Sequence, residues 1–127
     1  MAITLETSAR NAACNAIVDL CDVGSSDANG DLVIGTSGMG TTLAVLALSN
    51  PAFGAASTGV ATANSITDDT SADDTGTAAA FILRDRDNTT VLTGSVGTSG
   101  EDINLNTVSI TSGDTVSITS LTATMPA

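Results

Sequence analysis

The side chains that could do chemistry gather in one short acidic segment. Asp68, Asp69, Asp73 and Asp74 place four carboxylates within seven residues. Carboxylate oxygens are ligands that Ca²⁺ prefers, so these four residues are the candidate calcium ligands of the chain. The favoured interpretation is a solvated loop whose charge keeps the protein soluble. We therefore expect no bound metal and no cofactor, with calcium at this segment as the alternative.

Two glycine-containing segments share part of the pattern of a ligand-binding loop. Residues 27–31 have the D-x-N-x-D opening of an EF-hand, but Leu32 and Gly38 stand where that loop requires Gly and Glu. Residues 35–40 lack the Lys-Ser/Thr pair that ends a phosphate-binding P-loop. Both segments are predicted to be turns or loops without a ligand.

The composition argues against catalysis. The chain has no His and no Lys, which removes the commonest general base near neutral pH and the amine of Schiff-base chemistry. Two Phe and no Trp or Tyr leave little aromatic surface for a sugar-binding platform. We therefore predict that the protein is not an enzyme. A calcium-dependent carbohydrate-binding β-sandwich that uses the acidic segment stays open as an alternative.

The charge of the chain limits its partners. Fourteen acidic residues and three Arg give a net charge of −11. Binding to nucleic acid depends mainly on Lys and Arg, so no nucleic-acid partner is expected. No stretch reaches the ~18 apolar residues that span a bilayer, and the first six residues lack the pattern of a signal peptide. We expect no membrane partner, and a protein that is made and assembled in the cytoplasm.

The N-terminal part contains the predicted helix. Apolar residues recur from Leu5 to Leu20 with a period near 3.6, and Gly24 ends the pattern. Thr4 or Thr7 is expected to cap the start. Because small side chains dominate this stripe, it allows close approach to a sheet or to a neighbouring subunit. The stripe consists of Leu5, Ala9, Ala12, Ala13, Ala16, Ile17 and Leu20.

The two cysteines lie on this predicted helix. Cys14 and Cys21 are seven residues apart, which separates them by about 10 Å along a helix axis. That distance exceeds the ~7 Å Cα separation that a disulfide tolerates. Buried free thiols are expected, with an intermolecular bridge as the alternative.

From Asp31 onward the apolar period changes to two, which is typical of strands. Strands are predicted at 31–35, 43–48, 59–66, 77–84 and 90–96, with a hairpin turn at 84–88. The sequence T-V-S-I-T-S occurs at 107–112 and again at 115–120, which predicts a second hairpin and a bulge near Ser120. The fold predicted for residues 1–127 is one mainly β domain, an antiparallel β-sandwich or barrel with one N-terminal α-helix. Residues 1–24 form its lead-in and helix, and residues 31–127 form its β-rich body.

Several short phrases of the sequence resemble small virion-associated proteins of tailed bacteriophages. They are N-A-I-V-D at 15–19, N-P-A-F-G at 50–54, T-D-D-T-S-A at 67–72, G-S-V-G-T-S-G at 94–100 and the closing stretch 115–126. The likeness covers nearly the whole chain but brings no functional residues with it. It implies a virion structural protein, above all a capsid cement or decoration protein. A tail, neck or fibre component is the alternative.

The expected partners follow from that resemblance. A cement protein would bind the major capsid protein on the outer surface of the virion after assembly in the host cytoplasm. The lean core also points to a homo-oligomer, in which the chain binds further copies of itself. Deletion of residues 2–24 is expected to abolish particle binding and to leave a β-rich monomer. The residues expected to contact the partner are Ile3, Leu5, Ala9, Ala13 and Ile17.

Overall fold

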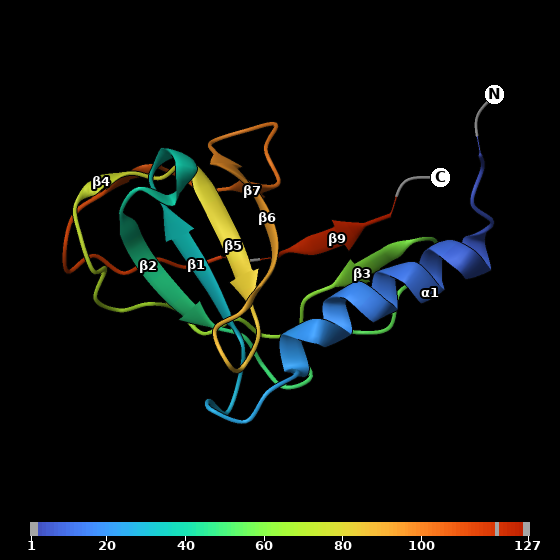
Figure 1. Cartoon of the computed structure of the whole chain (residues 1–127). Helices are drawn as coiled ribbons and strands as arrows, with labels where there is room; N and C mark the ends of the chain where they lie inside the picture. Colours follow the sequence, from blue (N-terminus) through green and yellow to red (C-terminus); the bar gives the residue numbers. More distant parts are fainter. Residues whose placement is uncertain (1–2, 119, 126–127) are drawn as a thin grey trace.

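The computed structural model describes residues 3–118 and 120–125 of the chain (Figure 1). Strands dominate, and a single N-terminal helix, α1 (Thr7–Val18), continues into the short 3-10 helix η1 (Asp19–Asp22), as the sequence predicted. A second 3-10 helix, η2 (Ser37–Met39), connects the first two strands. The strands are β1 (Asp31–Gly35), β2 (Thr42–Ala47), β3 (Val60–Thr62), β4 (Gly76–Thr77), β5 (Ala80–Arg84), β6 (Thr90–Gly97), β7 (Ile103–Asn104), β8 (Ser109–Ile110) and β9 (Thr122–Thr124).

Five strands form the main sheet, in the order β2-β1-β5-β6-β7. All neighbours are antiparallel except β6 and β7, which run parallel. Because side chains alternate between the faces of a sheet, one face carries Leu32, Ile34 and Leu83, and the other carries Val33 and Ile82. The face with Leu32 belongs to the core, and Leu32, Ile34 and Leu83 are almost fully buried there.

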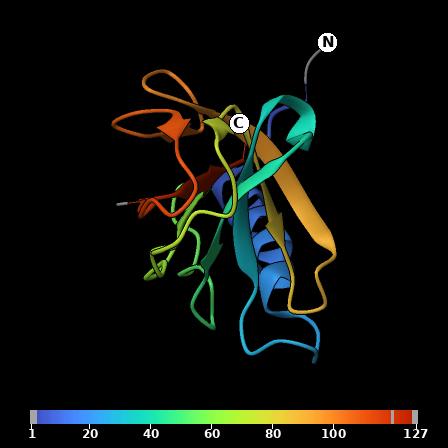
Figure 2. The ribbon, with the colours of Figure 1, turned by 90° about the vertical axis from the view of Figure 1, so that its left-hand side faces the viewer.

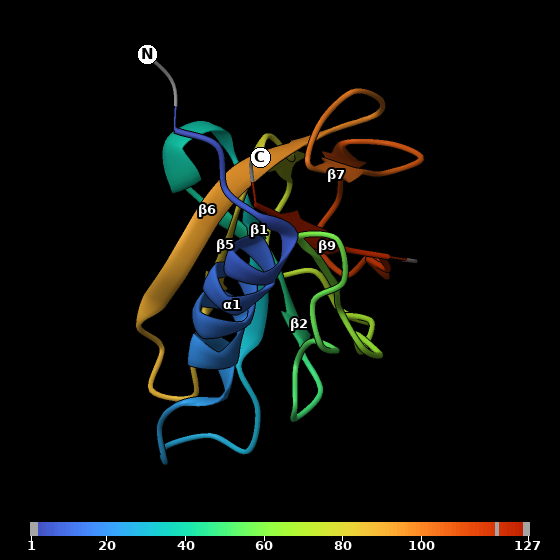
Figure 3. The same ribbon diagram turned by 90° about the vertical axis from the view of Figure 1, so that its right-hand side faces the viewer.

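The core face of the sheet is covered by α1 and by two short strand pairs, β3–β9 and β4–β8. Figure 2 shows the main sheet along one side of the molecule, and Figure 3 shows α1 in front of β1 and β5. Cys14 and Val18 of α1 and Cys21 of η1 are buried in the same cluster as Phe81 and Leu83 of β5. The helix and the β-rich body therefore share one core, in a sandwich-like arrangement.

The local strand predictions are largely confirmed. β1 has the predicted bounds, and β5 and β6 form the predicted hairpin around the turn at 84–88. β2 is buried on both faces, since Leu43, Ala44 and Leu46 are all inaccessible to solvent. β3 is shorter than predicted, because only Val60–Thr62 pair with β9.

The predicted hairpin between the two T-V-S-I-T-S copies is wrong. The first copy contributes β8, which pairs with β4, and Val116 of the second copy pairs with Asp69. Ile110 and Val116 are both buried, so each copy packs into the core instead of facing the other. The bulge predicted near Ser120 adjoins residue 119, which lies outside the described residues.

The start of α1 also differs from the prediction. Glu6 occupies the N-cap position and makes no side-chain cap hydrogen bond, so neither Thr4 nor Thr7 caps the helix. The Thr7 hydroxyl instead accepts a 3.4 Å hydrogen bond from the Arg10 guanidinium. The α-helical part ends at Val18, and η1 carries the turn pattern on to Asp22.

Candidate interaction surface

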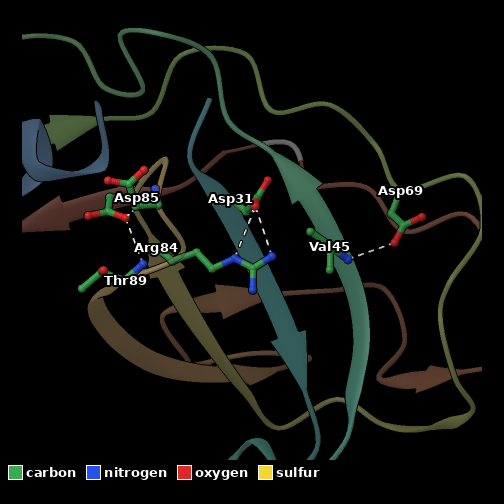
Figure 4. Close-up of polar contacts among 7 residues, drawn as sticks. Asp31, Val45, Asp69, Arg84, Asp85 and Thr89 are labelled. Carbon is green, nitrogen blue, oxygen red and sulfur yellow. Dashed lines mark hydrogen bonds and ion pairs between the residues drawn. The ribbon is translucent and has the colours of Figure 1, made fainter. Parts of the chain in front are cut away.

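The acidic segment holds one structural carboxylate. Both oxygens of Asp69 accept main-chain hydrogen bonds at 2.9 Å. One bond comes from the N–H of Val45 (Figure 4), and the other comes from the N–H of Ser71. The main chain of Asp69 pairs with Val116 in both directions. Asp69 therefore fastens β2 to the C-terminal part of the chain, and neither of its oxygens is left without a hydrogen bond.

The other candidate calcium ligands are not gathered around Asp69. Asp68 and Asp73 are exposed, and Asp74 accepts a 2.8 Å hydrogen bond from the N–H of Thr75. Within residues 3–118 and 120–125, no three or more His, Cys, Asp or Glu side chains come together as metal ligands. The geometry assigns the segment a structural role along β2.

Residues 67–73 run along the outer edge of β2, on the side away from β1. The N–H of Thr67 bonds to the carbonyl of Ala47 at 2.9 Å, and the N–H of Asp73 bonds to that of Leu43 at 2.7 Å. Together with the bond from Val45 to Asp69, these contacts satisfy alternate residues of the strand. Sequence reasoning missed this role because it depends on the register between distant segments.

No element in the described part of the chain covers the N-terminal arm (residues 3–6) and the outer face of α1 (Ala9, Ala12 and Ala16). This surface is largely apolar, with the exposed polar residues Glu6, Ser8 and Asp19 beside it. Ile3 is 88% exposed and Leu5 is 38% exposed, and all three alanines are exposed. The surface continues into η1 at Leu20, which is 49% exposed. Large exposed apolar residues that lie together mark interaction sites more often than single ones do.

The two asparagines of α1 point toward the protein instead of toward solvent. The side-chain oxygen of Asn11 accepts a 2.7 Å bond from the N–H of Gly59, and that of Asn15 accepts a 2.8 Å bond from the N–H of Ala56. The two asparagines thus supply acceptors for the N–H groups of Ala56 and Gly59 in the turn before β3, which would otherwise lack partners. The outward side of the helix is consequently uncharged and rich in alanine, with Thr7 and Ser8 at its start, whereas a surface helix usually carries charged residues there.

The predicted helical period is right, but the stripe that faces the core is a different one. Cys14, Val18 and Cys21, spaced four and three residues apart, are the buried residues of α1 and η1. Of the expected partner contacts, Ile3, Leu5 and Ala9 are exposed, whereas Ala13 and Ile17 are half-buried. Alanine fits either side of a helix, so the 4-3 spacing of Cys and Val was the sequence signal that distinguished the core face.

Both cysteines are free and buried, as predicted. The Cys14 thiol lies 3.4 Å from the carbonyl oxygen of Ala123 and donates to it. Burial, reinforced by the nearby carboxylates of Asp22 and Asp85, raises the pKa of the Cys21 thiol to about 11. A thiol held neutral in this way is a poor nucleophile at physiological pH.

Carboxylates connect the loop between η1 and β1 to the turn between β5 and β6 by hydrogen bonds. Asp87 accepts 2.9 Å bonds from the N–H groups of Ser25 and Ser26, and these bonds lower the pKa of its carboxyl. Asp31 of β1 pairs with Arg84 of β5 at 3.2 Å, and Asp85 accepts a bond from the N–H of Thr89 (Figure 4). Much of the acidity on this side therefore serves internal hydrogen bonding.

A groove of about 200 Å³ opens between β6 and β9, and we call it the β6–β9 groove. α1, β5 and Phe53 contribute its apolar lining, which we call its floor, and residues of the two strands and Asp102 complete it. In Figure 3, α1 lies between β6 and β9. The lining residues used below are Cys14, Ile17, Thr93, Thr122, Thr124 and Met125.

Comparisons with known proteins gave no relative. A scan against models of protein families, a search of curated proteins and a search of solved structures each found no match to this chain. None of the helices in the described part of the chain has the length and apolar character needed to cross a membrane.

Proposed function

We propose that the protein is a structural component of a bacteriophage virion, and that it serves as a capsid cement protein. In this role it would bridge neighbouring major capsid subunits from the outside of the head. The observation that carries the proposal is the uncharged, alanine-rich outer face of α1 on a chain whose net charge is −11. The resemblance of its sequence to virion-associated proteins is the reason for proposing a virion as the assembly.

The distribution of charge supports an outer position. A protein with fourteen acids and three Arg is repelled by the phosphates of packaged DNA, while an outer surface in contact with solvent tolerates that charge. On the outer face of α1 the alanines allow another surface to approach the helix backbone closely. Leu20 adds one large side chain, and complete burial of such a side chain contributes roughly 1.5–3 kcal/mol.

The buried residues of the N-terminal segment make its deletion a poor test of this function. Deletion of residues 2–24 would remove Cys14, Val18 and Cys21 from the core, so lost binding would report unfolding. A double substitution, Ala12→Glu with Ala16→Glu, is preferable because both residues are exposed and Glu is a good helix former. A control with the same added charge is Thr42→Glu with Thr90→Glu, at exposed positions on β2 and β6.

The measurement is co-sedimentation of each variant with purified capsids that lack the protein. We expect the control to bind as the unchanged chain does and the A12E/A16E variant to lose at least tenfold in affinity. Equal binding of both variants would overturn the docking surface. Mass spectrometry of purified particles tests virion membership itself. Gel densitometry separates a cement protein, near the copy number of the capsid protein, from a tail, neck or fibre protein, present in few copies.

A further inference from the structure

Two strand edges without partners face each other across the β6–β9 groove. β6 pairs with β5 on one side, and on the other side β7 pairs only with Val96 and Gly97. β9 pairs with β3 alone. Within residues 3–118 and 120–125, no strand therefore pairs with the first six residues of β6 on the groove side or with the corresponding side of β9. An exposed edge of this kind can accept an added strand.

The hydrogen bonds show which main-chain groups point into the groove. The N–H of Val96 bonds to Ala79 beside β5, and groups alternate along a strand, so Thr93 and Ser95 direct theirs away from β5. The N–H of Ser95 confirms this direction, since it bonds to the Asp102 carboxylate at 3.0 Å.

The same reasoning applies to β9. On the β3 side, the carbonyl of Leu121 accepts a bond from the N–H of Ala63, and the N–H of Met125 donates to the carbonyl of Gly59. Because the direction of main-chain groups alternates along a strand, Thr122 and Thr124 point theirs away from β3. Both threonines line the groove together with Thr93. An extended segment lying between β6 and β9 would therefore find main-chain donors and acceptors on both sides.

The lining of the groove suits an extended peptide. Its volume of about 200 Å³ is below the roughly 300–1,000 Å³ of pockets that enclose small molecules, so an occupant would lie along the open groove with part of its surface exposed. Ile17 and Met125 supply apolar contacts, and the strand edges supply hydrogen bonds. A strand with apolar side chains at every second residue matches this combination.

The chain itself contains such a strand in its N-terminal arm. The sequence Ile3-Thr4-Leu5-Glu6 alternates apolar and polar residues, all four are exposed, and Glu6 has extended dihedral angles (φ −66°, ψ 158°). Figure 1 shows the arm leaving α1 in the direction away from the rest of the molecule. To enter its own groove, the arm would have to reverse direction before Thr7. This stretch has none of the Gly, Pro or Asn residues that tight reversals use.

We propose that the N-terminal arm of a second copy enters the β6–β9 groove, and that two copies exchange their arms reciprocally. Ile3 and Leu5 would face the floor of the groove, while Thr4 would lie beside Thr93 on the opposite face. Because each copy gives one arm and accepts one, the assembly closes as a symmetric dimer. The exchange leaves Ala9, Ala12 and Ala16 free, so it is independent of the proposed contact with the capsid.

A cysteine trap in the purified full chain tests the exchange without any virus particle. One tagged chain carries Thr4→Cys, and a second chain with a different tag carries Thr93→Cys. The matched control replaces the second chain by Thr42→Cys, on the sheet edge that residues 67–73 cover. Opposed residues of neighbouring antiparallel strands have Cα atoms about 4.5–5.5 Å apart, which lies within the roughly 4.4–6.8 Å that a disulfide spans.

We expect the T4C and T93C chains to form a mixed disulfide under mild oxidation, and the T4C and T42C chains to form at least tenfold less. Analytical ultracentrifugation should show a dimer that I3D/L5D converts to monomer and T4D leaves intact. No preferential mixed disulfide, or a T4C/T93C double variant that bridges only within one chain, would overturn the proposal. These results do not depend on capsid binding, so the two proposals can fail separately.

Discussion

The main sheet ends at β2 on one side, and on the other side β7 pairs only with Val96 and Gly97, so most of β6 is an edge as well. The chain treats the edges of β2 and β6 differently. At β2, alternate main-chain groups of Leu43, Val45 and Ala47 are satisfied by residues 67–73, with the Asp69 carboxylate in the middle. At β6, the Asp102 carboxylate bonds to Ser95, while Thr93 faces the open β6–β9 groove. A carboxylate thus occupies one main-chain donor at each edge, but only at β2 does a whole segment cover the strand as well. The comparison indicates that β2 is closed to partners and that β6 is available to them.

The largest effect is expected from Asp69→Ala, which opens the closed edge. The substitution leaves the half-buried N–H of Val45 without an acceptor and frees Ser71, so we expect a loss of about 1–3 kcal/mol in the free energy of unfolding. Denaturant titration measures this loss. The control Asp68→Ala, at an exposed neighbour, should change stability by less than about 0.5 kcal/mol. Equal effects of the two substitutions would show that charge, and not the hydrogen bonds to β2, matters.

A second prediction concerns pH and the 3-10 helix η1, which continues α1 beyond the open edge. The pKa of Cys21 is raised from 9.0 to about 11, so the unfolded chain releases this proton at a lower pH than the folded chain. Stability that is present below pH 9.0 is therefore expected to fall as pH rises toward about 11. Denaturant midpoints measured across this range should decline less steeply for Cys21→Ala than for the unchanged chain. Parallel declines would contradict the assignment to Cys21.

The smallest effect on stability is expected from Asp102→Ala at the open edge. Asp102 and its partner Ser95 make exposed hydrogen bonds, so the loss in unfolding free energy should stay below about 1 kcal/mol. Freeing the N–H of Ser95 should at the same time raise the fraction of dimer seen by ultracentrifugation. A variant with less dimer than the unchanged chain would mean that Asp102 supports the groove instead of limiting access to it.

The features that were predictable from the sequence are local. β1 and the β5–β6 hairpin follow from alternation of apolar residues and from a polar turn, each within about twenty residues. The pairing of β8 with β4 was missed because the adjacent T-V-S-I-T-S copies suggested a simpler local partner. The strand has only two residues, Ser109 and Ile110, too few for its pattern to indicate a distant partner.

The candidate surface was predicted in part, for a physical reason that α1 illustrates. Its apolar stripe is visible in the sequence, yet alanine loses little by exposure or by burial, so composition could not place that stripe on the inside or the outside. The choice depends on Asn11 and Asn15, whose acceptors serve the turn before β3. Nothing near these residues in the sequence reveals that need, because their partners lie about forty residues further along the chain.

The contact between Cys14 and Ala123 has a consequence for the order of events during synthesis. The two residues are 109 positions apart, and α1 also packs beside β3 and β9. A ribosome therefore releases the helix long before it makes the strand against which the helix docks. The helix emerges before that strand yet docks only after it, and until then Cys14 and Val18, which the folded protein buries, face the cell. Slowing the final stage of translation should accordingly lengthen the interval during which Cys14 reacts with a thiol reagent.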